Sequence, residues 1–316
     1  MRFTVRDSRW LAAIILALCW MVNAVAQTAT TTTKSSTQAT NLIDVIGDGK
    51  IDWSTGELRA RGTGFAPKFA QTPGQITALA REAAIVAAER NLLKVINGVQ
   101  ISAETTVENL IITQDTIKTQ VKGLLRGAVI VCEKPFGDQG YEIVLAVNIV
   151  GGKTSLARSI DLADQFKTAN PAVTILPTTT PQPNHQPTDT TVVPATGRDG
   201  YTGLVIDCRG LGLSRSMCPR IVDQTNTNIW STLTISADLV NERGIAGFYQ
   251  SIDDPTITER VGKHPLVVKA LRASGGKAFK TDAVISPADT ELIHAENTKT
   301  MFLEKLNVAF LVDKGA

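Results

Sequence analysis

A stretch rich in threonine and proline divides this chain of 316 residues into two parts. Six prolines fall between Pro171 and Pro194. Proline fixes φ and lacks a backbone N–H, so such a dense run opposes both helices and central strands. We therefore predict a linker over residues 157–199, with one folded domain at residues 41–156 and another at residues 200–316.

The first 26 residues have the pattern of an export signal. Three arginines precede an apolar run over residues 10–22, and the small residues Ala24 and Ala26 follow it. A run of roughly 13 residues is too short for the ~20 that a membrane-spanning helix needs. We expect cleavage between Ala26 and Gln27, no transmembrane helix in the mature chain, and a place in the periplasm or at the outer membrane. Residues 27–40 are rich in threonine, which predicts a flexible tether.

Charge and metal-ligand patterns exclude several classes of function. The whole chain has 32 basic and 30 acidic residues, and the signal holds three arginines and one aspartate, which leaves 29 of each. A balanced charge does not favour nucleic acid as a partner. The three histidines lack metal-ligand spacing, and GDGKID at residues 47–52 lacks two oxygen ligands of a calcium loop. We expect no metal or other cofactor, and a tight turn at GDGKID.

The first domain alternates strand and helix patterns. Its elements are expected at residues 43–52, 57–61, 76–98, 106–125, 128–133 and 141–150. Ala80, Ala83 and Ala87 fall on one face of the first helix, which indicates close packing. The segment 128–133 is nearly all apolar, so we expect a central strand with Cys132 buried. This order predicts an antiparallel or mixed sheet with helices on one face.

The stretch AREAAIVAAERNLLKVINGVQIS, a polar second helix, GLLRGAVIV and the strand hairpin that follows resemble the lipoprotein-20 family over residues 41–155. That family occurs in bacterial outer-membrane lipoproteins and flagellar accessory proteins. The resemblance implies an α/β interaction domain without catalytic residues, and partners at the outer membrane or the flagellum. The chain departs from the lipoprotein members because the large Leu18 precedes Cys19, which is unfavourable for lipidation.

The second domain is also predicted to be α/β, so the whole chain has the class α/β (α+β) with two small mixed-sheet domains. Strands are expected at residues 201–208, 247–250, 283–285 and 307–313, and a hairpin at residues 221–230. Helices are expected at residues 257–262, 266–273 and 287–295, the last with Ser286 as its N-cap and Pro287 in its first turn.

The loop after the first of these strands is the candidate site. Gly210 and Gly212 allow close backbone approach, and Arg209, Arg215 and Arg220 have the chemistry to bind an anion or carboxylate together. The alternative is a connecting loop with solvated arginines. The third glycine of a dinucleotide-binding fingerprint is absent.

Two further interpretations concern the same region. Ser214, His264 and Asp207 supply the residue types of a hydrolase triad, but no GxSxG motif accompanies them. Cys208 and Cys218 flank the loop, and an exported chain meets an oxidising compartment, so we predict a disulfide between them. Closing this short loop would stabilise the domain by ~3 kcal/mol. The alternative is two separate buried thiols.

Taken together, the sequence predicts an exported, non-catalytic envelope protein. Its partners would be other envelope proteins, including outer-membrane or flagellar components, in an interaction or assembly role. The alternative is a periplasmic small-ligand-binding protein or hydrolase that uses the second domain. Few histidines and no complete catalytic motif favour the first hypothesis.

Overall fold

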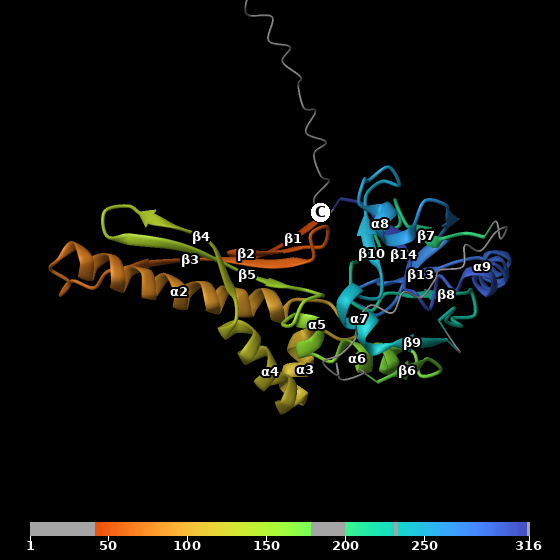
Figure 1. Cartoon of the computed structure of the whole chain (residues 1–316), viewed down its shortest axis with the longest axis horizontal. Coiled ribbons are helices and arrows are strands. Elements are labelled where there is room, and N and C mark those ends of the chain that lie inside the picture. The colour runs from red at the N-terminus through yellow and green to blue at the C-terminus, as the bar shows by residue number, and fades with distance from the viewer. Residues whose placement is uncertain (1–41, 178–199, 231–232, 315–316) are drawn as a thin grey trace, which may run out of the picture. The chain divides into compact units, whose positions relative to one another are not determined.

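The computed structural model describes residues 42–177, 200–230 and 233–314 (Figure 1). Within these residues, eight helices and four sheets confirm the predicted mixed α/β class. No helix in the described ranges has the length and apolar character needed to cross a bilayer. The predicted signal, its cleavage site between Ala26 and Gln27, and the tether lie outside the described residues.

The first block builds one antiparallel sheet with the strand order β1-β2-β3-β5-β4. GDGKID forms the tight turn between the first two strands as predicted, with Gly47 at a φ of 57°. The elements are β1 (Ile43–Ile46), β2 (Gly49–Asp52), β3 (Glu57–Phe65), α2 (Pro73–Asn97), α3 (Val107–Thr113), α4 (Asp115–Arg126), β4 (Val129–Phe136) and β5 (Gly140–Asn148).

Helix α2 begins and ends at signals that are readable in the sequence. The Thr72 side chain accepts a hydrogen bond from the Gln75 N–H, the Gln75 side chain accepts one from the Thr72 N–H, and Pro73 occupies the first turn. The helix ends before Gly98, as predicted. Gly98 has a φ of −76°, which residues with side chains also adopt. Glycine is needed there for lack of space, because a Cβ would lie 2.6 Å from Ile46 Cδ1.

The packing of α2 on the sheet is very close. Its buried stripe repeats every four residues and includes Ala84 and Ala88, one position beyond the predicted Ala83 and Ala87. A Cβ added at Gly62 of β3 would lie 2.1 Å from the backbone nitrogen of Ala88. Small residues on both elements therefore bring the two backbones together, and Figure 1 shows α2 lying along the sheet.

Strand β4 is an edge strand, and the prediction of a central strand with Cys132 buried is wrong. All eight of its residues are exposed, Cys132 among them. It pairs with β5 across the predicted hairpin, with a bulge between Ile130 and Cys132. The apolar run was misleading because α2 packs on β3 and β5, while β4 lies beyond them. An apolar strand of this length has the same sequence pattern whether it is covered or not.

The second block is built on a parallel sheet with the order β10-β14-β7-β11. Its strands are β7 (Gly203–Asp207), β10 (Gly247–Tyr249), β11 (Pro265–Lys269) and β14 (Val308–Leu311). A three-stranded sheet contains β8 (Arg220–Val222), β12 (Arg272–Ser274) and β13 (Asp282–Val284), and the helices are α7 (Ala237–Arg243), α8 (Ile257–Val261) and α9 (Pro287–Thr300).

Most predicted elements of this block are confirmed, including α9 with Ser286 as its N-cap. The predicted helix at residues 266–273 is wrong, because this segment forms β11 and β12. In β11 the buried Leu266 and Val268 alternate with the exposed Val267 and Lys269, which is the period of a strand.

The predicted linker at residues 157–199 begins too early. Residues up to 177 are folded into α5 (Leu156–Ser159), α6 (Leu162–Ala169) and β6 (Thr174–Leu176), which pairs in parallel with β9 (Thr234–Ser236). Proline is compatible with this arrangement because Pro171 lies between α6 and β6. Residues 178–199 lie outside the described residues.

One hydrophobic core runs through both blocks. The rings of Phe166 in α6 and Trp230 meet edge to face, with centroids 5.7 Å apart. The Met217 N–H donates to the Gln100 carbonyl at 2.9 Å, and the Cys218 N–H donates to the Ile101 carbonyl at 2.8 Å. The described parts of the two predicted domains therefore pack against each other.

Candidate functional site

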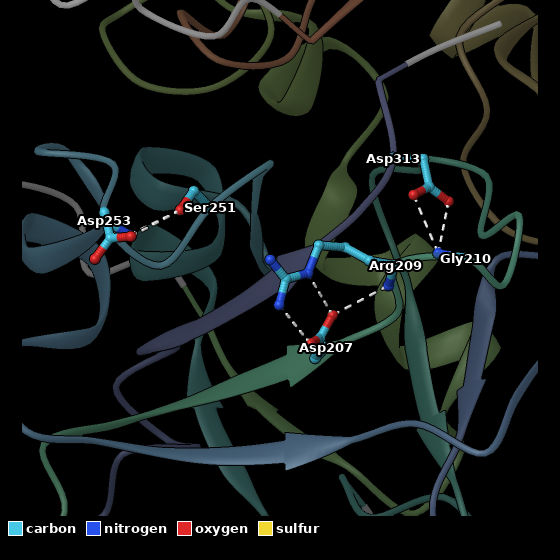
Figure 2. Close-up of polar contacts among 6 residues, drawn as sticks. All are labelled: Asp207, Arg209, Gly210, Ser251, Asp253 and Asp313. Carbon is cyan, nitrogen blue, oxygen red and sulfur yellow. Dashed lines mark hydrogen bonds and ion pairs between the residues drawn. The ribbon is translucent and has the colours of Figure 1, made fainter.

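The carboxyl ends of the parallel strands carry the candidate loop. Ligands of parallel α/β sheets usually bind beyond this edge. Asp207 is the last residue of β7 and pairs in register with Lys269 of β11 and Leu311 of β14. Asp313 follows β14, and Ser251 follows β10, so polar groups from three strands lie at one edge (Figure 2).

The carboxylate of Asp207 forms an ion pair with the neighbouring Arg209. The Arg209 guanidinium binds Asp207 with two hydrogen bonds of 2.8 and 2.7 Å, and the Arg209 N–H donates to the same carboxylate at 3.1 Å. The hydrogen bond from the Arg209 side chain is the largest cause that lowers the pKa of Asp207 below its usual value. Both charges are therefore already paired.

The carboxylate of Asp313 binds the backbone of the candidate loop. The Gly210 N–H donates to both carboxylate oxygens of Asp313, at 2.9 and 3.0 Å, as Figure 2 shows. Gly210 has a φ of 78°, a conformation that side-chain-bearing residues rarely adopt. Ser251 donates to Asp253 at 3.3 Å within its own turn. No group of three or more potential metal ligands occurs in the described ranges.

The three arginines do not bind one anion together, so that prediction is wrong. Arg209 pairs with Asp207, as described above. Arg215 pairs with Asp44 of β1, and its side chain is only 7% exposed. Arg220 pairs with the buried Asp282 of β13. Each guanidinium pairs with a carboxylate on a different strand, because Asp207 belongs to β7, Asp44 to β1 and Asp282 to β13.

The hydrolase triad does not assemble. His264 directly precedes β11, and its N–H donates to the Thr202 hydroxyl at the start of the neighbouring strand β7. Asp207 lies at the opposite, carboxyl end of β7. The His264 ring stacks on Tyr201, with centroids 5.0 Å apart. His264 and Asp207 are therefore separated by the length of strand β7. His264 cannot bind Asp207 and serve as the general base for Ser214.

The predicted disulfide is not formed in the structure. Cys208 and Cys218 are separate buried thiols. The backbone N–H of Cys208 donates to Leu311 of β14, whereas that of Cys218 donates to Ile101 in the first block. These bonds fix the two cysteines to different parts of the core.

Thiol reactivity distinguishes a Cys208–Cys218 disulfide from two separate buried thiols. Burial raises the pKa of Cys208 to about 12 and also raises the pKa of Cys218. Because the thiolate is the reactive form, an alkylating reagent should label the exposed Cys132 at neutral pH and leave both buried thiols unlabelled. Mass spectrometry of peptides from the native processed protein that starts at Gln27 measures this. The control is the same protein denatured, which should be labelled at Cys132, Cys208 and Cys218. A linked Cys208–Cys218 peptide would contradict the structure.

A cavity of about 660 Å³ lies beside the loop. Its lining includes Asp44, Trp53, Gln100, Arg215 and Asp313. The indole Nε1–H of Trp53 donates to Asp44 at 2.6 Å, and the Oε1 atom of Gln100 is buried without a hydrogen-bond partner. The volume is within the range of small-molecule sites. The sequence analysis found only lining residues of the loop itself, namely Gly212, Ser214 and Arg215. The other side chains join them through contacts between distant segments.

Comparison with known proteins bears on the second block. The resemblance of residues 41–155 to the lipoprotein-20 family is overturned, because the family model that matches the chain is a different one and lies elsewhere. An alanine-rich helix followed by a hairpin is a common packing pattern and does not identify a family. No curated protein matches the chain. The matching model is described as Treponema pallidum Tp0624, second domain, and it covers residues 203–314, so the second block, from the start of β7 to beyond β14, is similar to that domain.

Proposed function

We propose that this protein is an exported, non-catalytic protein of the cell envelope, in the periplasm or at the outer membrane, that binds other envelope proteins. Export rests on the signal pattern of residues 1–26. The loop arginines Arg209, Arg215 and Arg220 each form an ion pair with a separate carboxylate. This pairing supports a role without catalysis, since the charged groups are used in structural contacts.

The single observation that carries the proposal is the exposed edge strand β4. Its apolar residues Val129, Ile130 and Val131 are 63%, 37% and 46% exposed. An edge strand offers unpaired N–H and C=O groups to a strand of another chain. Lys134 and Pro135, which discourage such pairing, lie only in the second half of β4.

The outer face of the sheet, the side away from α2, adds to this surface. A hollow of about 610 Å³ is lined by Val45, Lys50, Arg59, Val131 and Val144, among others. Val45 is 75% exposed. A partner strand added to β4 would lie next to this hollow, where its side chains find both apolar and basic neighbours.

Site-specific cross-linking tests the proposal. A photo-reactive amino acid replaces Val131 in the chain expressed with its signal, and adducts are recovered from the envelope fraction. We expect a defined adduct with another envelope protein. The matched control is Val267 of the edge strand β11, which is 49% exposed. Equal adducts from both positions, or none from Val131, would refute binding through β4.

A further inference from the structure

The cavity of about 660 Å³ beside the candidate loop is built from segments that lie far apart in the sequence. One wall is a face of the β1–β2 hairpin, because Asp44 and Ile51 are register partners and side chains alternate along a strand. The candidate loop and Phe279 supply further wall. The Ser214 N–H donates to the Lys280 carbonyl at 2.8 Å, which joins the loop to the segment that carries Phe279. Main-chain contacts therefore hold the walls together.

Two aromatic rings contribute to the lining of this cavity. Phe279 is 41% exposed, and Trp53 is half-buried. The orientation of Trp53 is fixed, because its indole Nε1–H donates to Asp44 and its ring meets Phe248 edge to face, with centroids 5.6 Å apart. Aromatic rings beside aliphatic side chains suit a ligand that has an apolar face. The aliphatic members of the lining are Ile46, Ile51 and Leu213.

The charged groups of the lining balance one another. Asp44 and Asp313 are acidic, and Arg215 and Lys314 are basic. Asp44 pairs with Arg215, and both carboxylate oxygens of Asp313 accept from the Gly210 N–H (Figure 2). A ligand with a net charge of either sign would meet two lining groups of its own sign, which is unfavourable. The lining therefore favours a neutral ligand.

Gln100 adds a requirement for a hydrogen-bond donor. This residue lines the cavity and is 5% exposed. Its Nε2 atom donates to the Ser102 carbonyl, whereas its Oε1 atom has no hydrogen-bond partner among the described residues. A buried acceptor without a donor is unfavourable, so a ligand that brings a hydroxyl or N–H group is preferred over one that lacks it. Ser214 also lines the cavity and can donate or accept.

We propose that this cavity binds a neutral saccharide. A pyranose ring has C–H groups on its faces, which pack on aromatic rings, and hydroxyl groups at its edge, which donate and accept hydrogen bonds. An apolar ligand would leave Gln100 Oε1 unpaired, and an ion would meet charges of its own sign. The inference goes beyond the proposed binding through β4 and does not depend on it, since no residue of β4 is among the described residues that line the cavity.

Saccharide binding by the processed protein that starts at Gln27 provides the test. The probes are an array of neutral oligosaccharides of glucose, galactose and N-acetylglucosamine. Trp53 and Trp230 are the two tryptophans of the processed chain, so Trp230→Phe leaves Trp53 as its only tryptophan. We expect binding on the array, and a saturable change in Trp53 emission when the best-bound oligosaccharide is titrated into this variant.

Phe279→Ser locates the binding site. We expect it to weaken binding of that oligosaccharide about tenfold, which corresponds to about 1.4 kcal/mol. The matched control is Phe136→Ser, because Phe136 is 42% exposed, Phe279 is 41% exposed, and Phe136 lies at the end of β4. Equal losses for the two variants, or no saccharide bound by the parent protein, would overturn the inference. Binding of N-phenyl-1-naphthylamine instead, weakened by Phe279→Ser, would assign the cavity to an apolar ligand. The cross-linking result at Val131 is independent of each of these outcomes.

Discussion

Replacement of Gly62 by alanine is expected to lower the free energy of unfolding by about 3 kcal/mol, the upper part of the range for overpacked sites. The added Cβ would lie 2.1 Å from the Ala88 nitrogen and 2.4 Å from the Ala84 carbonyl oxygen. These are backbone atoms of α2 and cannot turn aside as a side chain does. The helix must move away from β3, and packing along its buried face is lost.

Urea unfolding of the variant and its parent measures this effect. The matched control is Gly123→Ala in α4, where an added Cβ meets nothing within 4 Å. That change should raise the stability by about 0.5–1 kcal/mol, because alanine favours the helix. Equal stabilities of Gly62→Ala and the parent protein would show that α2 does not lie as close to the sheet as described.

Trp230→Ala should produce a loss of about 4 kcal/mol, as expected for removal of a large buried ring. Trp230 is fully buried and meets Phe166, which comes from the part of the chain before residue 178. Its removal therefore weakens the packing of the second block against the part of the chain before residue 178. When a protease site inserted within residues 178–199 is cut, we expect the parent fragments to co-elute in gel filtration and the Trp230→Ala fragments to separate.

Trp230→Phe is the control for this change. It keeps an aromatic ring for Phe166 and removes the indole N–H, which is buried without a hydrogen-bond partner. We expect its stability to be within about 1.5 kcal/mol of the parent, and its cut fragments to stay together. Separation of the parent fragments would instead support the independent domains that the proline-rich stretch predicts.

The elements that depend on local signals were predictable. The start of α9 at Ser286 and Pro287, the end of α2 before Gly98, and the strands β7 and β14 follow from caps, turn residues and apolar runs. Their determinants lie within a few residues of each element. The antiparallel sheet with its covering helix was predictable for the same reason.

The parts that depend on distant neighbours were not predictable. The sequence of β4 is apolar, but its exposure depends on how far α2 reaches across the sheet. The charge of Arg215 is evident from the sequence, but its partner Asp44 is 171 residues away. The arginines of the loop therefore had the chemistry of an anion site, and only the contacts between segments show that they are structural ion pairs.

The order of strands in the parallel sheet bears on how the protein matures. Strand β14 is the last strand along the described residues but lies between β10 and β7. Until residues 308–311 are delivered, β10 has no neighbour to join and the sheet is left open in its middle. Contacts that join such distant residues form late. The parallel sheet of the second block therefore cannot close before residues 308–311 are present. In the proposed export, folding of this block would wait until β14 has passed through the channel.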